Sequence, residues 1–234
     1  MNLPKSITPC PIKDAILEIR FASTTNPNAI FGLIYSKLSE EFPKVESLPI
    51  LQLPDNVRSN DVNLKFKPYY KISNDTFVVQ TGPDIIAISS FPNYLGWDSF
   101  SDKIRMILEK INELNIINEV LRVGIRYINF FNEDIYPNIN LNIEFPTLPY
   151  EKKDVYIKTE IDQGDFSSIL QIGNKVELNN AIGSIIDIDT YKTEGLGNFM
   201  SQPLLIINEG HQKEKEIFFE LLENEFLYSL DPRY

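Results

Sequence analysis

The sequence is poor in the residues that build most common catalytic and metal sites. Its 234 residues include one cysteine, one histidine, one tryptophan and ten glycines. A lone cysteine, Cys10, excludes an intramolecular disulfide and every metal motif that needs several cysteines. A lone histidine, His211, excludes metal sites with two histidine ligands. General acid or base catalysis is therefore left to one imidazole or to carboxylates.

Loops that hold phosphate groups and long apolar segments are missing as well. No G-x-x-x-x-G-K-[ST], G-x-G-x-x-G or G-x-S-x-G pattern occurs, so neither a phosphate-binding loop nor a nucleophile elbow is indicated, and we expect no cofactor. No stretch approaches the roughly 18 apolar residues of a membrane span. Pro4, Pro9 and Pro11 interrupt the segment in which a signal peptide would begin. We therefore expect a cytoplasmic protein without a membrane segment.

Positive charge is scarce relative to negative charge. Twenty-two Lys and Arg residues against 33 Asp and Glu residues give a formal net charge of −11, and the pI is about 4.7. A field of this sign repels phosphate backbones, so we do not expect direct nucleic-acid binding. A basic protein partner is compatible with this negative charge, although surface charge more usually serves to keep a protein soluble. Assembly with further copies of the same chain is left open.

Hydrophobic patterning divides the chain into strands and helices. Short β-rich runs, most of them alternating and bounded by turn residues, predict strands at 14–21, 62–70, 76–81, 85–91, 121–131, 139–145, 155–161, 168–172 and 182–191. Apolar residues at helical spacing predict three main helices, at about 26–42, 98–114 and 209–229. We expect Asn26 and Pro27 to begin the first helix, and Asp98 or Ser99 to cap the second.

These elements predict an α+β fold with antiparallel sheets. Turn residues between consecutive strands favour antiparallel hairpins, and the regular strand–helix alternation of a doubly wound sheet is missing. Two βα-meander halves packed together, residues 1–117 and 118–234, are one arrangement of these elements. A single domain is the alternative, since the chain is long enough for one large domain or two small ones.

Two arginines are candidate binding residues. Arg122 and Arg126 share one face of the predicted strand at 121–131, and Gly124 between them leaves room for a ligand or a neighbouring backbone. Such a pair can hold a carboxylate of a partner. Pairing with Glu18 or other acids of the same chain is the alternative.

Trp97 and His211 are the other candidate binding residues. Trp97 follows a Tyr-Leu-Gly segment at the entrance of the second helix, where an aromatic side chain can anchor an interface. The alternative is that it packs the loop onto the core. His211 follows Gly210 at the expected start of the last helix, where it would either cap that helix or contribute to a binding site.

Two aspartates are candidate metal ligands. Asp187 and Asp189 lie two apart in the predicted strand at 182–191, so both carboxylates project from one face. Paired carboxylates can bind Mg²⁺ or Mn²⁺, which would suit a metal-dependent hydrolase or nuclease. No third acidic ligand can be assigned, and an Asp-x-Asp pair is also common on solvated strand faces.

Several segments, taken in order along the chain, resemble a sporadically distributed family of uncharacterised bacterial proteins of about 250 residues. The resemblance rests on P-I-x-x-A-x-x-E-I-R-F (Pro11 to Phe21), on Tyr94, Gly96, Trp97 and Phe100, on G-x-R-Y-I-N (Gly124 to Asn129), on I-D-I-D (Ile186 to Asp189) and on His211. It spans nearly the whole chain. Each motif alone is weak, and their order carries the identification.

The resemblance implies an association and no reaction. Sporadic distribution is typical of mobile defence and toxin–antitoxin genes, so the resemblance implies a protein that neutralises or scaffolds a partner encoded nearby. The missing catalytic motifs favour the same interpretation. We therefore expect a non-catalytic protein-binding module, such as an antitoxin, immunity or defence-accessory protein, with the metal-dependent hydrolase as the alternative.

Overall fold

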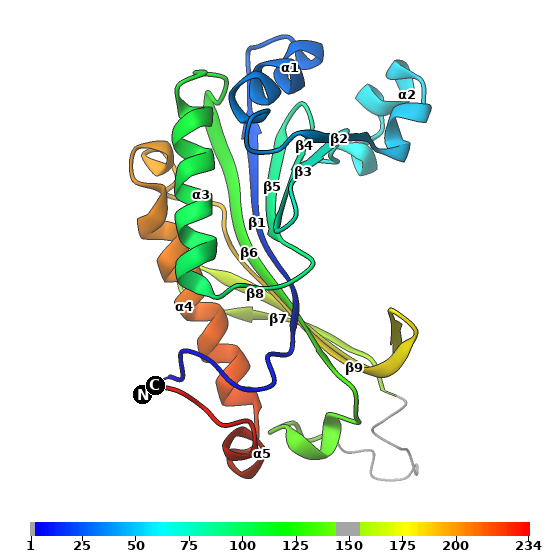
Figure 1. Ribbon diagram of the computed structural model, residues 1–234, viewed down its shortest axis with the longest axis vertical. Coiled ribbons are helices and arrows are strands. Elements are labelled where there is room, and N and C mark those ends of the chain that lie inside the picture. The colour runs from blue at the N-terminus through cyan, green and yellow to red at the C-terminus, as the bar shows by residue number, and fades with distance from the viewer. Residues whose placement is uncertain (1–2, 144–154) are drawn as a thin grey trace.

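The computed structural model describes residues 3–143 and 155–234, which form one nine-stranded sheet and five α-helices (Figure 1). The strands are β1 (Ile12–Ala22), β2 (Lys44–Ser47), β3 (Tyr70–Ser73), β4 (Phe77–Thr81), β5 (Ile85–Ser90), β6 (Glu119–Phe131), β7 (Ile157–Asp162), β8 (Ser167–Leu178) and β9 (Ala181–Lys192). The helices are α1 (Pro27–Leu38), α2 (Asp55–Asn60), α3 (Trp97–Asn112), α4 (Pro203–Leu221) and α5 (Asn224–Ser229). The predicted α+β class is confirmed.

The sheet has the order β2-β3-β4-β5-β1-β6-β9-β8-β7, and every pair of neighbours is antiparallel. Both long central strands, β1 and β6, are therefore hydrogen-bonded on their two sides. The boundary at 117/118 falls between α3 and β6, and β6 pairs directly with β1 from the other side of that boundary. The two predicted halves thus contribute to one continuous sheet.

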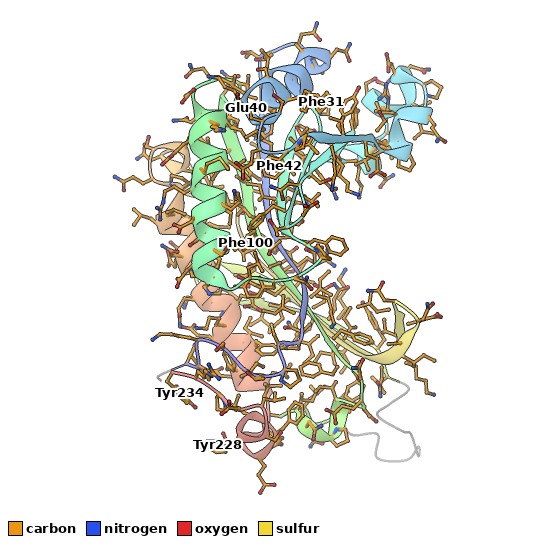
Figure 2. The ribbon with its side chains drawn as sticks, in the orientation of Figure 1. Phe31, Glu40, Phe42, Phe100, Tyr228 and Tyr234 are labelled. Carbon is orange, nitrogen blue, oxygen red and sulfur yellow. The ribbon has the colours of Figure 1, made fainter. Side chains whose placement is uncertain are left out.

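One face of the sheet is covered by helices. Alternation in β1 directs Ala15, Leu17 and Ile19 into the core, where each is fully buried. Helices α1, α3 and α4 pack on this face, and α3 lies beside α4 (Figure 1). Phe42 and Phe100, labelled in Figure 2, are fully buried in the same layer. Within the described residues, no long helix packs on the other face; the short helix α2 lies on that side at one end of the sheet (Figure 1).

Helices α1 and α3 overlap the predicted ranges 26–42 and 98–114, but α1 ends at Leu38, before the predicted end at 42. The Asn26 side chain accepts a hydrogen bond from the Asn28 N–H at 3.0 Å and caps α1, as expected. Helix α3 begins at Trp97, directly after Gly96, whose φ of 91° suits glycine. The expectation that Asp98 or Ser99 caps α3 is therefore wrong, because both residues lie inside its first turn.

The last helix differs most from the prediction. Helix α4 begins at Pro203, with proline in the first turn, and ends at Leu221, where Leu222 turns extended and pairs with Ile139. A separate short helix, α5, follows. Gly210 and His211 consequently lie in the middle of α4 and not at a helix start, so His211 has no capping role.

Two predicted strands also differ. Residues 62–70 do not form a strand: Val62–Leu64 is a 3₁₀ turn, Val62 is 79% exposed, and β3 begins only at Tyr70. Phe66 has a φ of 57°, which interrupts any extended conformation there. Of the predicted strand at 139–145, Ile139 forms a single bridge, and residues 144 and 145 lie outside the described residues.

Within residues 3–143 and 155–234, no helix combines the length and the hydropathy needed to cross a bilayer.

Candidate functional site

The uncovered side of the sheet, which we call the open face, carries a row of charged side chains. Antiparallel register brings residues of distant segments together there, because directly paired residues point to the same side. Gly124 of β6 pairs with Glu18 of β1 and Tyr191 of β9. Arg126 pairs in the same way with Ile16 and Asp189.

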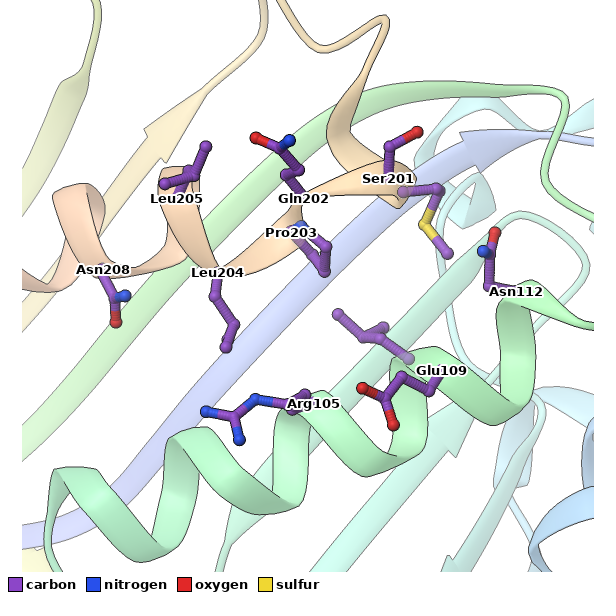
Figure 3. Close-up of a pocket in the computed structure, with 11 residues that line it drawn as sticks. Arg105, Glu109, Asn112, Ser201, Gln202, Pro203, Leu204, Leu205 and Asn208 are labelled. Carbon is purple, nitrogen blue, oxygen red and sulfur yellow. The ribbon is translucent and has the colours of Figure 1, made fainter.

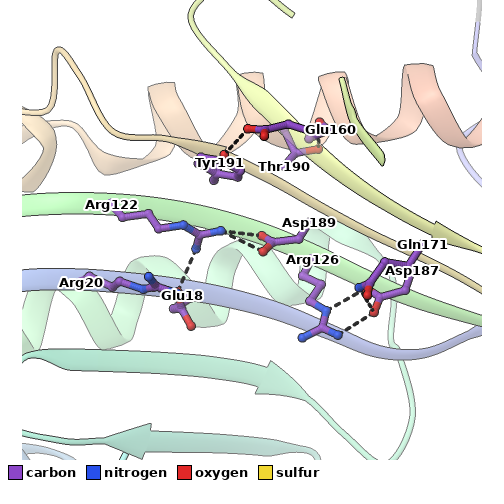
Figure 4. Close-up of polar contacts among 11 residues, drawn as sticks. Glu18, Arg20, Arg122, Arg126, Glu160, Gln171, Asp187, Asp189, Thr190 and Tyr191 are labelled. Atoms are coloured by element: carbon purple, nitrogen blue, oxygen red, sulfur yellow. Dashed lines mark hydrogen bonds and ion pairs between the residues drawn. The ribbon is translucent and has the colours of Figure 1, made fainter. Parts of the chain in front are cut away.

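Arg122 is fully engaged by acids of the same chain (Figure 4). Its Nη1 donates to Glu18 Oε1 at 2.8 Å, and its Nη2 donates to both oxygens of Asp189 at 2.8 and 3.0 Å. The guanidinium also lies over the ring of Tyr191, 4.5 Å from its centroid. Only 10% of the side chain is exposed. Arg122 is therefore paired with acids of its own chain, Glu18 and Asp189.

The space beside Gly124 is filled by Arg122. A Cβ atom at position 124 would lie 2.4 Å from Arg122 Nη1 and 3.0 Å from its Cζ. The room expected for a ligand at Gly124 is thus occupied by the guanidinium of the same strand. Glycine at position 124 leaves room for the guanidinium, which folds back over it.

Arg126 is engaged on one side and open on the other. Its Nε and Nη2 donate to the two oxygens of Asp187 at 2.7 and 2.5 Å, and this bidentate contact raises the pKa of Arg126 further. Gln171 also donates to Asp187, at 3.1 Å. Nη1 of Arg126 makes no hydrogen bond to any described residue, and 39% of the side chain is exposed. Arg126 can therefore still contact a bound group.

The two candidate metal ligands are paired with arginines. Asp187 is held by Arg126 and Asp189 by Arg122 (Figure 4). Among the residues that the structure describes, no group of three His, Cys, Asp or Glu side chains is placed to hold a metal ion. The ion pairs favour a structural role for both aspartates over cation binding.

Asp14 is the least satisfied polar residue of the open face. Its Oδ1 is shielded from solvent and has no hydrogen-bond partner among the described residues. Burial raises the pKa of Asp14 to about 6, although Arg126 and the Ala15 backbone N–H act in the opposite direction. A carboxylate in this condition gains from any group that supplies a donor or a positive charge.

A pocket of about 220 Å³ lies on the open face and connects these residues. Its charged and polar walls include Asp14, Glu18, Arg126 and Gln80, and Phe66 and Lys67 of the loop before β3 close one side. This pocket is our candidate functional site. It brings Arg122, Arg126 and Asp189, which the sequence predicts as site residues, together with Asp14, which no sequence pattern indicated.

The other two predicted binding residues meet on the helical face. The ring of Trp97 stacks on His211 with centroids 3.7 Å apart, and His211 Nδ1 lies 3.0 Å from the Tyr127 hydroxyl. The Tyr94 hydroxyl lies 3.5 Å from that of Tyr127 and extends this chain. Burial, reinforced by the charge of Lys215, lowers the pKa of His211 to about 3. Trp97 and His211 are thus packed against each other, apart from the open-face pocket.

Glu214 lies one turn beyond His211 and was not predicted. It is only 4% exposed, and no hydrogen bond to it is found within the described ranges. Burial raises its pKa to about 8, against the smaller effect of Lys215. The signal was available in the sequence, because Glu214 continues the helical spacing of Ile207, Gly210 and Phe218 on the buried side of α4.

A second hollow lies between α3 and α4 (Figure 3). Its volume is about 440 Å³, and Leu108, Met200 and Leu204 form much of its apolar wall. Arg105 and Glu109 border it from α3. This groove contains none of the predicted site residues.

Comparisons of the sequence with models of known protein families and with curated proteins found no match. The resemblance to a sporadically distributed bacterial family consequently stays a prediction.

Proposed function

We propose that the protein is a non-catalytic binding module that docks a protein partner on its open face, in the manner of an antitoxin, immunity or defence-accessory protein. One observation carries the proposal: helices cover one side of the nine-stranded sheet, while the other side presents ordered ion pairs around a pocket. Ordered charged groups around a pocket, on a side of the sheet without long helices, are suited to recognition by a folded partner.

Preorganisation supports this use of the open face. Arg122 and Arg126 are already held by Asp189 and Asp187, so a partner would not have to order these long side chains on binding. Charged groups held in defined positions contribute specificity and a fast association rate. The formal charge of −11 favours a partner of opposite charge. A small acidic protein that neutralises a basic effector would combine these properties.

Site-specific crosslinking tests the proposal. A photoreactive phenylalanine analogue would replace Lys67, which is exposed on the rim of the pocket, in cells that also express the neighbouring genes. We expect a covalent adduct with one basic protein, identified by mass spectrometry. The matched control places the same analogue at Gln212, an exposed residue of α4 on the helical side.

Three outcomes would contradict the proposal. If neither position gave an adduct, the proposal that a protein partner binds would be contradicted. If both positions gave equal adducts, the open face would not be the docking surface. An adduct between two copies of this chain at position 67 would make the open face a contact of a homo-oligomer.

A further inference from the structure

We infer that Asp14 and the pocket beside it receive a basic side chain, lysine or arginine, from the docked partner. This inference rests on the proposed function and names the chemistry that the open face recognises. Three observations carry it: a carboxylate without an ion pair, a buried oxygen of that carboxylate without a hydrogen-bond partner, and a pocket with room for one side chain.

The charges of the open face leave one carboxylate without a counter-ion. Each arginine of the network contacts an acid: Arg20 contacts Glu18 at 2.8 Å, Arg122 contacts Glu18 and Asp189, and Arg126 contacts Asp187. Asp14 is the carboxylate of this network that has no ion pair among the described residues. A cation that reached Asp14 would supply that pair.

No other cation of the pocket supplies that charge. Arg126 acts on Asp14 through space without a hydrogen bond to it, and its Nε and Nη2 donate to Asp187. Lys67, on the rim, is exposed and makes no ion pair within the described part of the chain. A buried carboxylate oxygen without a partner is costly, and a hydrogen bond from a charged donor offsets that cost.

The dimensions of the pocket limit what can enter. Its volume of about 220 Å³ is below the roughly 300 Å³ at which pockets for drug-sized ligands begin. Ile16, Phe66 and Ala87 provide apolar wall along which the methylene groups of a lysine or arginine can lie, while the charged end reaches a carboxylate. One long basic side chain satisfies both requirements.

An acidic side chain is the competing occupant, since Nη1 of Arg126 has no partner among the described residues. Two observations disfavour it. Asp14 already has no ion pair among the described residues, and the whole chain has a net charge of −11. A second carboxylate beside Asp14 would add repulsion between like charges.

A ligand titration by NMR tests the inference without the natural partner. Nα-acetyl-arginine amide and Nα-acetyl-lysine amide would be added to the isotope-labelled protein, and Nα-acetyl-glutamate amide would serve as the acidic probe. We expect a basic probe to shift the amide signals of Gly124, Ala87 and Ser89 until they saturate, with a dissociation constant in the millimolar range. The acidic probe should not shift them. These residues line the pocket.

Two matched variants identify the receptor group. Asp14→Asn should weaken binding of the basic probe at least tenfold, whereas Asp102→Asn, which makes the same charge change on α3, should leave it within twofold of the wild type. Equal weakening in both variants would show a general charge effect and overturn the inference. Should Asp14→Asn fail to give a dispersed spectrum, the comparison of basic and acidic probes on the wild type decides alone.

Two further results would overturn the inference. Binding of the acidic probe alone would make Arg126 the receptor, and the absence of binding by every probe would leave Asp14 without a ligand. Crosslinking at position 67 distinguishes this failure from that of the proposed function. Adducts that persist while no basic probe binds would contradict the role of Asp14 and leave the docking face intact.

Discussion

At the scale of single residues, the open face depends on a glycine that accommodates an arginine. Gly124 lies between Glu18 and Tyr191 in the sheet, and the Arg122 guanidinium occupies the volume above it. Arginine can satisfy two carboxylates at once because its donors form a planar fork. Any side chain at position 124 would displace that fork.

We predict that Gly124→Ala destabilises the protein by about 1–3 kcal/mol, because displacement of Arg122 leaves Asp189 partly buried without its donor and leaves Glu18 with Arg20 alone. Urea denaturation followed by the fluorescence of Trp97, the single tryptophan, measures the change. Gly32→Ala is the matched control: it lies inside α1 with nothing within 4 Å of the added Cβ, so it should be neutral or stabilising by up to about 1 kcal/mol.

A double-mutant cycle separates the proposed cause from general strain in β6. In an Arg122→Met background the guanidinium is gone, and Gly124→Ala should cost much less than in the wild type. An equal cost in both backgrounds would contradict the displacement of Arg122.

At the scale of secondary-structure elements, α4 combines close packing with a buried acid. Gly210 allows the helix to approach the sheet, since a Cβ there would lie 3.2 Å from both Ile125 and Phe166. One turn later Glu214 occupies a position that usually holds an apolar residue. The helix therefore carries a titratable group in its buried stripe.

We predict that Glu214 lowers stability as pH rises from about 5 to 8. The ordinary pKa of a glutamate is 4.5 and that of folded Glu214 is about 8, so in this interval the folded state holds a proton that the unfolded state has lost. Rising pH therefore reduces the free energy of unfolding, by at most about 1.4 kcal/mol per pH unit. Glu214→Gln keeps the shape of the side chain and removes this dependence.

Chemical denaturation of wild type and Glu214→Gln at pH 5, 6, 7 and 8 checks this prediction. His211 titrates in the opposite sense, because its lowered pKa makes acid destabilising, but both proteins contain it and its effect cancels in the difference. Glu209→Gln, at an exposed position of the same helix, is the control and should follow the wild type. If the free energy of unfolding changed with pH in the same way for all three proteins, the raised pKa of Glu214 would be contradicted.

At the scale of the whole molecule, the paired central strands β1 and β6 join the two halves of the sequence. β1 lies between β5 and β6, and the N- and C-terminal segments also meet where Lys5 N–H donates to the Arg233 carbonyl at 2.6 Å. Helices α3 and α4, from opposite sides of the 117/118 boundary, pack side by side (Figure 1). Separation at that boundary would expose both the β1–β6 edge and the helical interface.

We predict that fragments 1–117 and 118–234 do not fold independently and that they assemble when co-expressed. Each fragment alone would expose one long central strand and part of the shared apolar core. Circular dichroism melting of the separate and mixed fragments checks this. A cooperative transition in either fragment alone would show that it is an independent domain.

Local spacing determined much of this protein from sequence alone. Alternation placed Arg122 with Arg126, and Asp187 with Asp189, on common strand faces, and helical periodicity located most of the three long helices. Prediction from local spacing was wrong at residues 62–70, where an alternating pattern does not form a strand. It was also wrong at Gly210, which it placed at the start of the last helix although the apolar stripe of α4 continues on both sides of it. The direction of a side chain follows from spacing because the backbone repeat sets it.

Only the tertiary structure decided which acid meets which arginine. Glu18, Arg122 and Asp189 come from strands far apart in the sequence, and their contact follows from the β1-β6-β9 order of the sheet. The isolation of Asp14 depends on the same order. Hydrogen bonds between distant strands set this register, and no local spacing of residues encodes them.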